Sequence, residues 1–124
     1  MSVFDDLTAM PVIRIWDGVL ARTIEGERCS LAVVELDPDS VVREHAHPNE
    51  QIGMVVRGSV SFRIADEERV VGPGATYCIP PNVPHEVHTG PDGAVVLDVF
   101  APPREDWKGL ARSDAQTPLW PEQP

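Results

Sequence analysis

The 124-residue sequence contains little cysteine and no long apolar run. Its two cysteines, Cys29 and Cys78, form no CxxC pair, which argues against a disulfide framework. No stretch of about 20 apolar residues is present that would span a membrane. The N-terminus, MSVFDDLTAM, lacks the basic start and apolar segment of a signal peptide. We therefore expect a protein of the reducing cytoplasm that does not bind membranes.

Basic residues are also scarce. The chain has 10 basic and 20 acidic residues, a formal net charge of −10, and Lys108 is its single lysine. A surface this acidic repels phosphate backbones, so nucleic-acid binding is not expected. The 42% hydrophobic and 24% charged residues are otherwise those of an ordinary globular protein with one domain.

The middle of the chain has no apolar pattern of helix length. Short runs rich in Val, Ile and Leu are separated instead by the turn sequences DPDS, RG, ADEE, GPG, PPNVP and GPDG. We predict strands over residues 12–16, 19–24, 30–36, 51–56, 59–64, 75–79, 85–89 and 94–100. Short strands at such regular spacing indicate an all-β sandwich or barrel. We assign residues 1–104 to the barrel and 105–124 to a proline-rich tail, which either packs through Trp107 and Trp120 or stays loose.

The stretch HAHPNEQ, residues 45–51, is the first candidate site. In an extended chain, side chains at i and i+2 share a face, so His45 and His47 can reach one ion. Gln51 follows a turn and can return its amide oxygen to the same point, whereas Glu50 should point away. A second stretch, GATYCIPPNVPHEVH, brings His85 onto a strand as a possible fourth ligand, with His88 on the opposite face. The alternative is a polar barrel rim whose imidazoles bond to the backbone.

Together the two stretches resemble the two signature motifs of the cupin superfamily. The matching positions are His45, His47, Gln51, Gly58, Gly74, Pro80 and His85. The chain departs from the motifs at Asp39 and Asn82, which replace glycines, at Thr89, which replaces asparagine, and at Gln51, which replaces glutamate. Asp and Asn tolerate the turn conformations that favour glycine.

The resemblance implies a small double-stranded antiparallel β-barrel of the jelly-roll type. It also implies a divalent transition metal (nickel, zinc, iron, manganese or cobalt) held by His45, His47, Gln51 and His85. Three imidazoles and an amide carry no charge, so such a metal keeps its full positive charge and acts as a stronger Lewis acid.

The stretch LDVFAPPREDW, residues 97–107, is the second candidate site. Asp98 and Phe100 share a face of the last predicted strand, and Arg104 follows after a turn. An aspartate within an apolar strand is costly unless it lines a polar cavity or is paired. These residues therefore indicate either a site within the barrel or a structural pair in which Asp98 bonds backbone and Arg104 closes the rim.

The arrangement also resembles the pectin-degradation cupins, which open 4,5-unsaturated monouronates to linear keto sugars. The resemblance implies catalytic roles for Asp98, Phe100 and Arg104 and a small anionic sugar-like substrate. Arg104 would bind the carboxylate, Phe100 would pack against the sugar ring, and Asp98 would be the general acid/base. Two alternatives stay open: another metal-dependent cupin enzyme, such as a dioxygenase or isomerase, and a cupin that only binds a small molecule.

Two further expectations concern residues outside the motifs. Tyr77 and Cys78 are adjacent in a predicted strand, so one of them should point into the barrel. Tyr77 is then either plain filling or an additional proton donor. The apolar positions on the outside of the barrel, including VIRIW at residues 12–16, exceed what one small barrel buries, which favours a homodimer.

Overall fold

The computed structural model describes residues 3–122, and almost all of its regular structure is β. In chain order the elements are η1 (Leu7–Ala9), β1 (Val12–Trp16), β2 (Val19–Glu25), β3 (Ser30–Leu36), β4 (Val41–His45), β5 (Glu50–Ile64), β6 (Glu67–Val71), β7 (Thr76–Ile79), β8 (His85–Ala101), η2 (Glu105–Trp107) and β9 (Arg112–Ser113). All strand pairs are antiparallel. The prediction of an all-β jelly-roll protein is confirmed.

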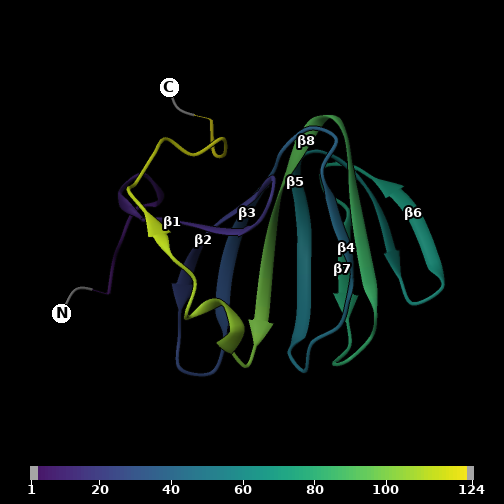
Figure 1. The fold of residues 1–124 in the computed structure, drawn as a ribbon, viewed down its shortest axis with the longest axis horizontal. Coiled ribbons are helices and arrows are strands. Elements are labelled where there is room, and N and C mark those ends of the chain that lie inside the picture. The colour runs from purple at the N-terminus through teal and green to yellow at the C-terminus, as the bar shows by residue number, and fades with distance from the viewer. Residues whose placement is uncertain (1–2, 123–124) are drawn as a thin grey trace.

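The long strands β5 and β8 form the centre of the fold (Figure 1). The first part of β5 pairs with β7 and with the last part of β8, and the sheet continues through β3, β2, β1 and β9. The second part of β5 pairs with β6 and with the first part of β8, which also pairs with β4. Each long strand therefore belongs to both halves of the barrel.

The core lies between these two halves, because alternate residues of each strand point inward. Its aromatic members are Phe62, Phe100 and Trp107, and the last of these comes from η2 rather than from a strand. The remaining buried members are aliphatic: Val19, Ala21, Ala32, Val34, Leu36, Val42, Val55, Val60, Ile79, Ala94 and Val96.

Three predicted breaks differ from the structure. RG lies within β5, which runs on through a bulge at this point. GPDG lies within β8 as a larger irregularity, because residues 90–93 face the single residue Ser59 between the pairs Gly58–Ala94 and Val60–Thr89. The acidic turn ADEE is shorter than predicted, since β6 begins at Glu67.

The two motif positions that replace glycine have the expected backbone conformation. Asp39 has φ of 54° and Asn82 has φ of 65°, both in the left-handed region that glycine, asparagine and aspartate favour. The substitutions are therefore compatible with the turns that the motifs require.

The C-terminal segment packs along the barrel. β9 pairs with β1. The buried Arg22 donates to Glu35 at 2.7 Å and to the Gln116 carbonyl at 3.0 Å, while the Leu119 N–H donates to Glu35 at 2.9 Å. A buried ion pair on the outer side of β2 and β3 thus helps to hold the segment around Gln116 and Leu119 in place.

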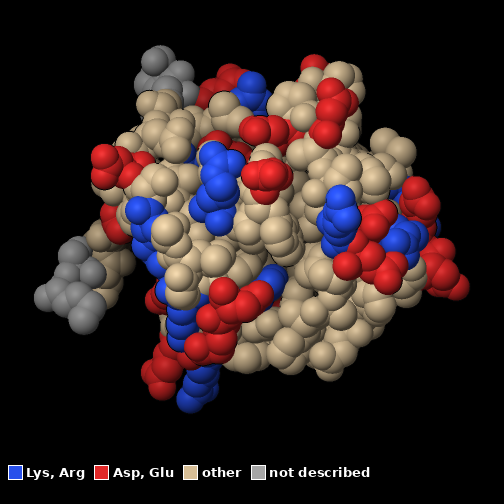
Figure 2. Space-filling model, in the orientation of Figure 1, with Lys and Arg blue, Asp and Glu red and all other residues tan. Residues whose placement is uncertain are grey.

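Charged side chains of both signs are interspersed with uncharged surface on the face seen in Figure 2. Among residues 3–122 no helix has the length and apolar character needed to cross a membrane.

Candidate metal centre and cavity

Three connecting segments meet at the lower end of the barrel in Figure 1: residues 45–50, residues 80–85 and residues 102–107. The Asn82 N–H donates to the His47 carbonyl at 2.8 Å, and the Asn49 side chain donates to the Pro102 carbonyl at 2.6 Å. Six buried polar side chains gather here: His47, Asn49, Gln51, His85, Asp98 and Arg104. Burying polar groups is costly, so such a concentration marks a candidate functional site.

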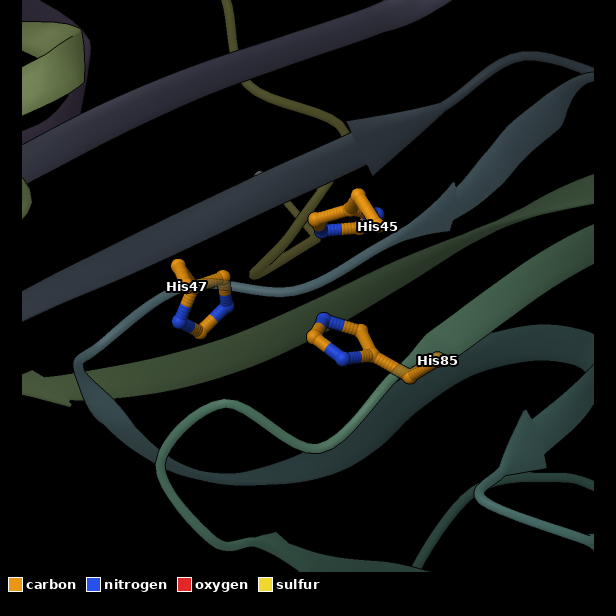
Figure 3. A group of neighbouring side chains, drawn as sticks. All are labelled: His45, His47 and His85. Atoms are coloured by element: carbon orange, nitrogen blue, oxygen red, sulfur yellow. The ribbon is translucent and has the colours of Figure 1, made fainter.

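Three histidines converge at this end of the barrel. His45 and His85 are direct cross-strand partners on β4 and β8, and His47 lies two residues beyond β4. One ring nitrogen of each lies within 4.8 Å of one on each of the others. Figure 3 shows the three rings turned toward a common space. The expectation that His45, His47 and His85 come together is met, in an arrangement that can hold a metal ion.

Each of the three rings is oriented by a backbone carbonyl. The Nδ1 atoms of His45, His47 and His85 lie 2.9, 3.1 and 2.9 Å from the carbonyl oxygens of Arg43, Asn49 and Val83. A carbonyl oxygen can only accept, so Nδ1 carries the proton and Nε2 keeps a lone pair. This is the tautomer that binds a metal through Nε2.

Burial keeps the imidazoles neutral. It lowers the pKa of His45 and His47 below the usual value, and it lowers the pKa of His85 to about 4. The backbone carbonyls oppose this shift but are outweighed. All three are therefore unprotonated near neutral pH, as metal ligands must be.

The contact between His47 and Gln51 fits a cation in particular. His47 Nε2 lies 3.0 Å from Gln51 Oε1, while His47 Nδ1 already faces the Asn49 carbonyl. A neutral imidazole has a single N–H and cannot donate to both oxygens. The Gln51 amide also hydrogen-bonds to Asp98, which takes its NH2 group and leaves Oε1 toward His47. A cation between Nε2 and Oε1 satisfies both atoms.

Asp98 lies beside this cluster on the inner face of β8. Its carboxylate is buried and accepts hydrogen bonds from the Tyr77 hydroxyl and from the Gln51 side chain. Burial raises the pKa of Asp98 to about 6, although both hydrogen bonds and Arg104 act to lower it. A carboxyl group with a pKa near neutrality is suited to both accept and donate a proton.

Arg104 lies over the same end of the barrel. Its Nε and Nη2 donate to the two carboxylate oxygens of Asp106 at 2.8 and 2.7 Å. Its guanidinium carbon lies 5.0 Å from the Phe100 ring centroid and 4.7 Å from that of Trp107. Nη1 makes no hydrogen bond with the residues that the structure describes. The Nη1–Nη2 edge of the guanidinium is thus left to bind an anion.

These groups line one cavity of about 60 Å³. That space is several times what a single water needs. His45, Gln51, His85, Asp98 and Arg104 provide its polar lining, and the rest is mainly aliphatic and aromatic. The cavity therefore presents its polar groups at one end of an apolar interior, as small-molecule sites do.

The remaining expectations about side-chain orientation are met. Glu50 and His88 are exposed, and His88 bonds to Glu86 at 2.8 Å. Tyr77 lines the cavity, whereas Cys78 is exposed.

Several contacts at the site were not predicted. These are the Tyr77–Asp98 hydrogen bond, the clamp of Arg104 by Asp106 and the edge-on contact of Trp16 with His45, whereas the expected packing of Trp107 is found. Only the nearness of Asp106 to Arg104 in sequence was available as a signal. The other contacts depend on strand register.

Two other proteins are similar to this chain in sequence. The chain is 29% identical over 105 residues to the pectin degradation protein KdgF of Dickeya dadantii (strain 3937), a match that covers 83% of this chain and 94% of that protein. It is 37% identical over 60 residues to the H2HPP isomerase of Bacillus subtilis, which is 48% of this chain but only 25% of the isomerase.

Solved structures show the same fold. The structure of KdgF from Halomonas sp. superimposes with a TM-score of 0.78 at 23% identity, over 86% of this chain and 98% of that one. An RmlC-like cupin from Shewanella frigidimarina gives a TM-score of 0.79 at 23% identity, over 86% of this chain and 96% of that one. The family model of the cupin domain matches residues 32–100, more than half of the sequence. The chain therefore belongs to the cupin family, and among its members it resembles the pectin-degradation protein KdgF.

Proposed function

We propose that this cupin is a metal-dependent enzyme that opens 4,5-unsaturated monouronates to linear keto sugars. The observation that carries the proposal is the position of Asp98, a buried carboxyl group that shares the cavity with the histidine cluster, Phe100 and Arg104. The similarity to KdgF along 94% of that protein supports the substrate class.

His45, His47, Gln51 and His85 would hold a divalent transition metal. Nitrogen ligands together with one amide oxygen suit nickel, zinc, iron, manganese and cobalt. When bound, the metal polarises substrate oxygens and stabilises the negative charge that develops on them. The neutral ligand set also makes the cavity attractive to an anion in a protein whose net charge is −10.

Arg104 and Phe100 orient the substrate. The free edge of the Arg104 guanidinium would donate hydrogen bonds to the uronate carboxylate, and Asp106 keeps the guanidinium in place. Phe100 contacts both the cluster and Arg104, since its ring centroid is 5.7 Å from that of His47 and 5.0 Å from the guanidinium carbon of Arg104. Its face packs against the apolar side of the sugar ring.

Asp98 moves the proton. The bond between C1 and the ring oxygen breaks as the C1 hydroxyl gives its proton to the carboxylate, which leaves an aldehyde at C1 and an enolate at C5. The enolate becomes a ketone when C4 takes this proton back from Asp98. No atom is gained or lost, so one carboxyl group that first accepts and then returns a proton is sufficient.

The test is the loss of ultraviolet absorbance of a lyase-generated 4,5-unsaturated galacturonate with metal-loaded protein. We expect decay faster than in buffer, and Asp98→Asn should bring it back to the spontaneous rate with the metal content unchanged. Cys78→Ser changes an exposed side chain on a neighbouring strand, and it is the control for effects of mutation and purification that do not involve the site. Decay no faster than in buffer, with metal bound, would refute the proposal.

A second candidate is an isomerase that acts on another small anion. The match of 37% identity over 60 residues to an isomerase favours it. If this candidate is correct, the metal-loaded protein does not convert the unsaturated uronate but binds other small carboxylates. Arg104→Met should abolish this binding.

A further inference from the structure

Tyr77 reaches Asp98 across an intervening strand. Tyr77 on β7 and Asp98 on β8 are both direct partners of Gly53 on β5, so the three residues form one row on the inner face of the sheet. The Tyr77 hydroxyl donates to Asp98 Oδ1 at 2.5 Å. A side chain can cross a strand in this way only if the residue beneath it is small. A Cβ at Gly53 would overlap both Asp98 Oδ1 and the end of the Tyr77 ring.

The phenol ring is held firmly by its surroundings. It packs against Phe62 with ring centroids 4.6 Å apart, and it lines the cavity with Asp98. Burial and the neighbouring Asp98 raise the pKa of Tyr77 well above its usual value, so the hydroxyl keeps its proton and stays a donor. Plain filling of the barrel requires no hydroxyl at this position.

We infer that Tyr77 is a positioning residue that fixes the Asp98 carboxylate for proton transfer. The inference rests on the proposed function. Asp98 has two anchors, the Gln51 amide and the Tyr77 hydroxyl. With only one anchor, the carboxylate turns about its terminal torsion, which is broad. With both, one orientation toward the cavity is selected before substrate arrives, and the proton travels over a set distance.

The first test needs no substrate. Tyr77 is the sole tyrosine of the chain, so the phenolate absorbance of the whole protein reports this residue alone. An alkaline titration should give a midpoint above the ordinary value of about 10. Asp98→Asn removes the neighbouring charge, and the ionisation constant should then rise by at least about tenfold. A midpoint that Asp98→Asn leaves unchanged would overturn the inference, because the two groups would then not be in contact.

The second test measures turnover. Tyr77→Phe keeps the ring and its packing on Phe62 but removes the donor. We expect kcat to fall by about tenfold or more, with KM within about twofold and with the metal content unchanged. Cys78→Ser, the adjacent residue on the outer face, is the matched control. A Tyr77→Phe protein with full kcat, or one whose defect lies in KM alone, would overturn the inference.

The two tests separate the inference from the proposed function. If the wild type does not turn over the unsaturated uronate, the proposed reaction fails, and the part of Tyr77 in that reaction fails with it. The titration still decides whether Tyr77 and Asp98 form a coupled pair.

Discussion

At the scale of single residues, Gln51 sets the charge of the candidate metal centre. Its amide faces His47 on one side and Asp98 on the other. A glutamate here would put a second carboxylate next to Asp98 and close to the anionic substrate that we propose. An amide can supply an oxygen ligand and a hydrogen-bond donor together, which a carboxylate cannot do.

Gln51→Glu should therefore separate metal binding from turnover. We expect the affinity for a divalent metal to rise by about tenfold or more, because the new ligand is charged. We expect kcat to fall, because the metal's charge is damped and Asp98 loses its donor. Competition with a metal-binding dye measures the first effect, and the uronate assay measures the second. Glu50→Gln, on the exposed neighbour, is the control, and an unchanged metal affinity in Gln51→Glu would argue against Gln51 as a ligand.

The contact between Tyr77 and Asp98 requires glycine at position 53, because Gly53 lies between them in the sheet. Gly53→Ala places a methyl group where both side chains now lie. We expect the free energy of unfolding to fall by about 1–3 kcal/mol, as for other overpacked sites. Gly72→Ala is a matched control, because the nearest atom to a Cβ there is 3.8 Å away. Urea denaturation of both variants tests the difference, and equal stability of the two would contradict it.

The convergence of the candidate ligand residues was open to prediction from sequence, and their surroundings were not. His45, His47, Gln51 and His85 stand at spacings that place them on strand ends or turns, which local pattern reveals. The Tyr77–Asp98 contact depends on the register of three strands, and no local pattern specifies register across β7, β5 and β8.

At the scale of elements, the strands with buried alternate residues were predicted well. β1 and β3 have the predicted bounds of residues 12–16 and 30–36. β6 was missed because four of its five residues are exposed and it begins with two glutamates. β4 was missed as a separate strand for the same reason, since Val42 is its single fully buried residue. Strands held mainly by pairing leave little hydrophobic signal in the sequence.

One buried ion pair helps to hold the C-terminal segment on the barrel. The Arg22 side chain is fully buried, and Glu35 both pairs with it and accepts from Leu119. Within residues 3–122, Arg22 Nε finds no hydrogen-bond partner. Loss of Glu35 would leave a buried cation without its counterion, which costs far more than the pair contributes.

Glu35→Leu should accordingly destabilise the protein by about 3–5 kcal/mol and expose the C-terminal segment to proteases. The double variant Arg22→Met/Glu35→Leu should be more stable than Glu35→Leu, since no unpaired charge remains. Urea denaturation and limited proteolysis of the two proteins test this prediction. A double variant less stable than Glu35→Leu would show that the two side chains do not act as a pair.

At the scale of the whole molecule, one row of apolar side chains on the outer side of the sheet is left partly exposed by the residues that the structure describes. Ile24, Leu31, Val99 and Ile52 are successive cross-strand partners on β2, β3, β8 and β5. Ile24 and Ile52 are 44% and 47% exposed. A contiguous apolar area of this kind is typical of an interface, and a second copy of the chain fits it by symmetry.

We therefore predict a homodimer in solution, formed through this face. Ile52→Glu puts a charge into its middle and should give a monomer, which sedimentation velocity distinguishes from a dimer. Val70→Glu is the control, because Val70 is an equally apolar residue at 79% exposure on β6, away from the interface. A wild-type monomer at micromolar concentration would exclude the dimer.

The central strands also tie the candidate metal site to the completion of folding. Gln51 lies at the start of β5 and His85 at the start of β8, and the pairing of these strands joins residues as far apart in sequence as Glu50 and Ala101. Contacts of such long range form late and slowly, because a large loop must close first. The candidate ligands therefore converge only in the finished barrel, so a metal bound at this site would select the native state and slow its unfolding.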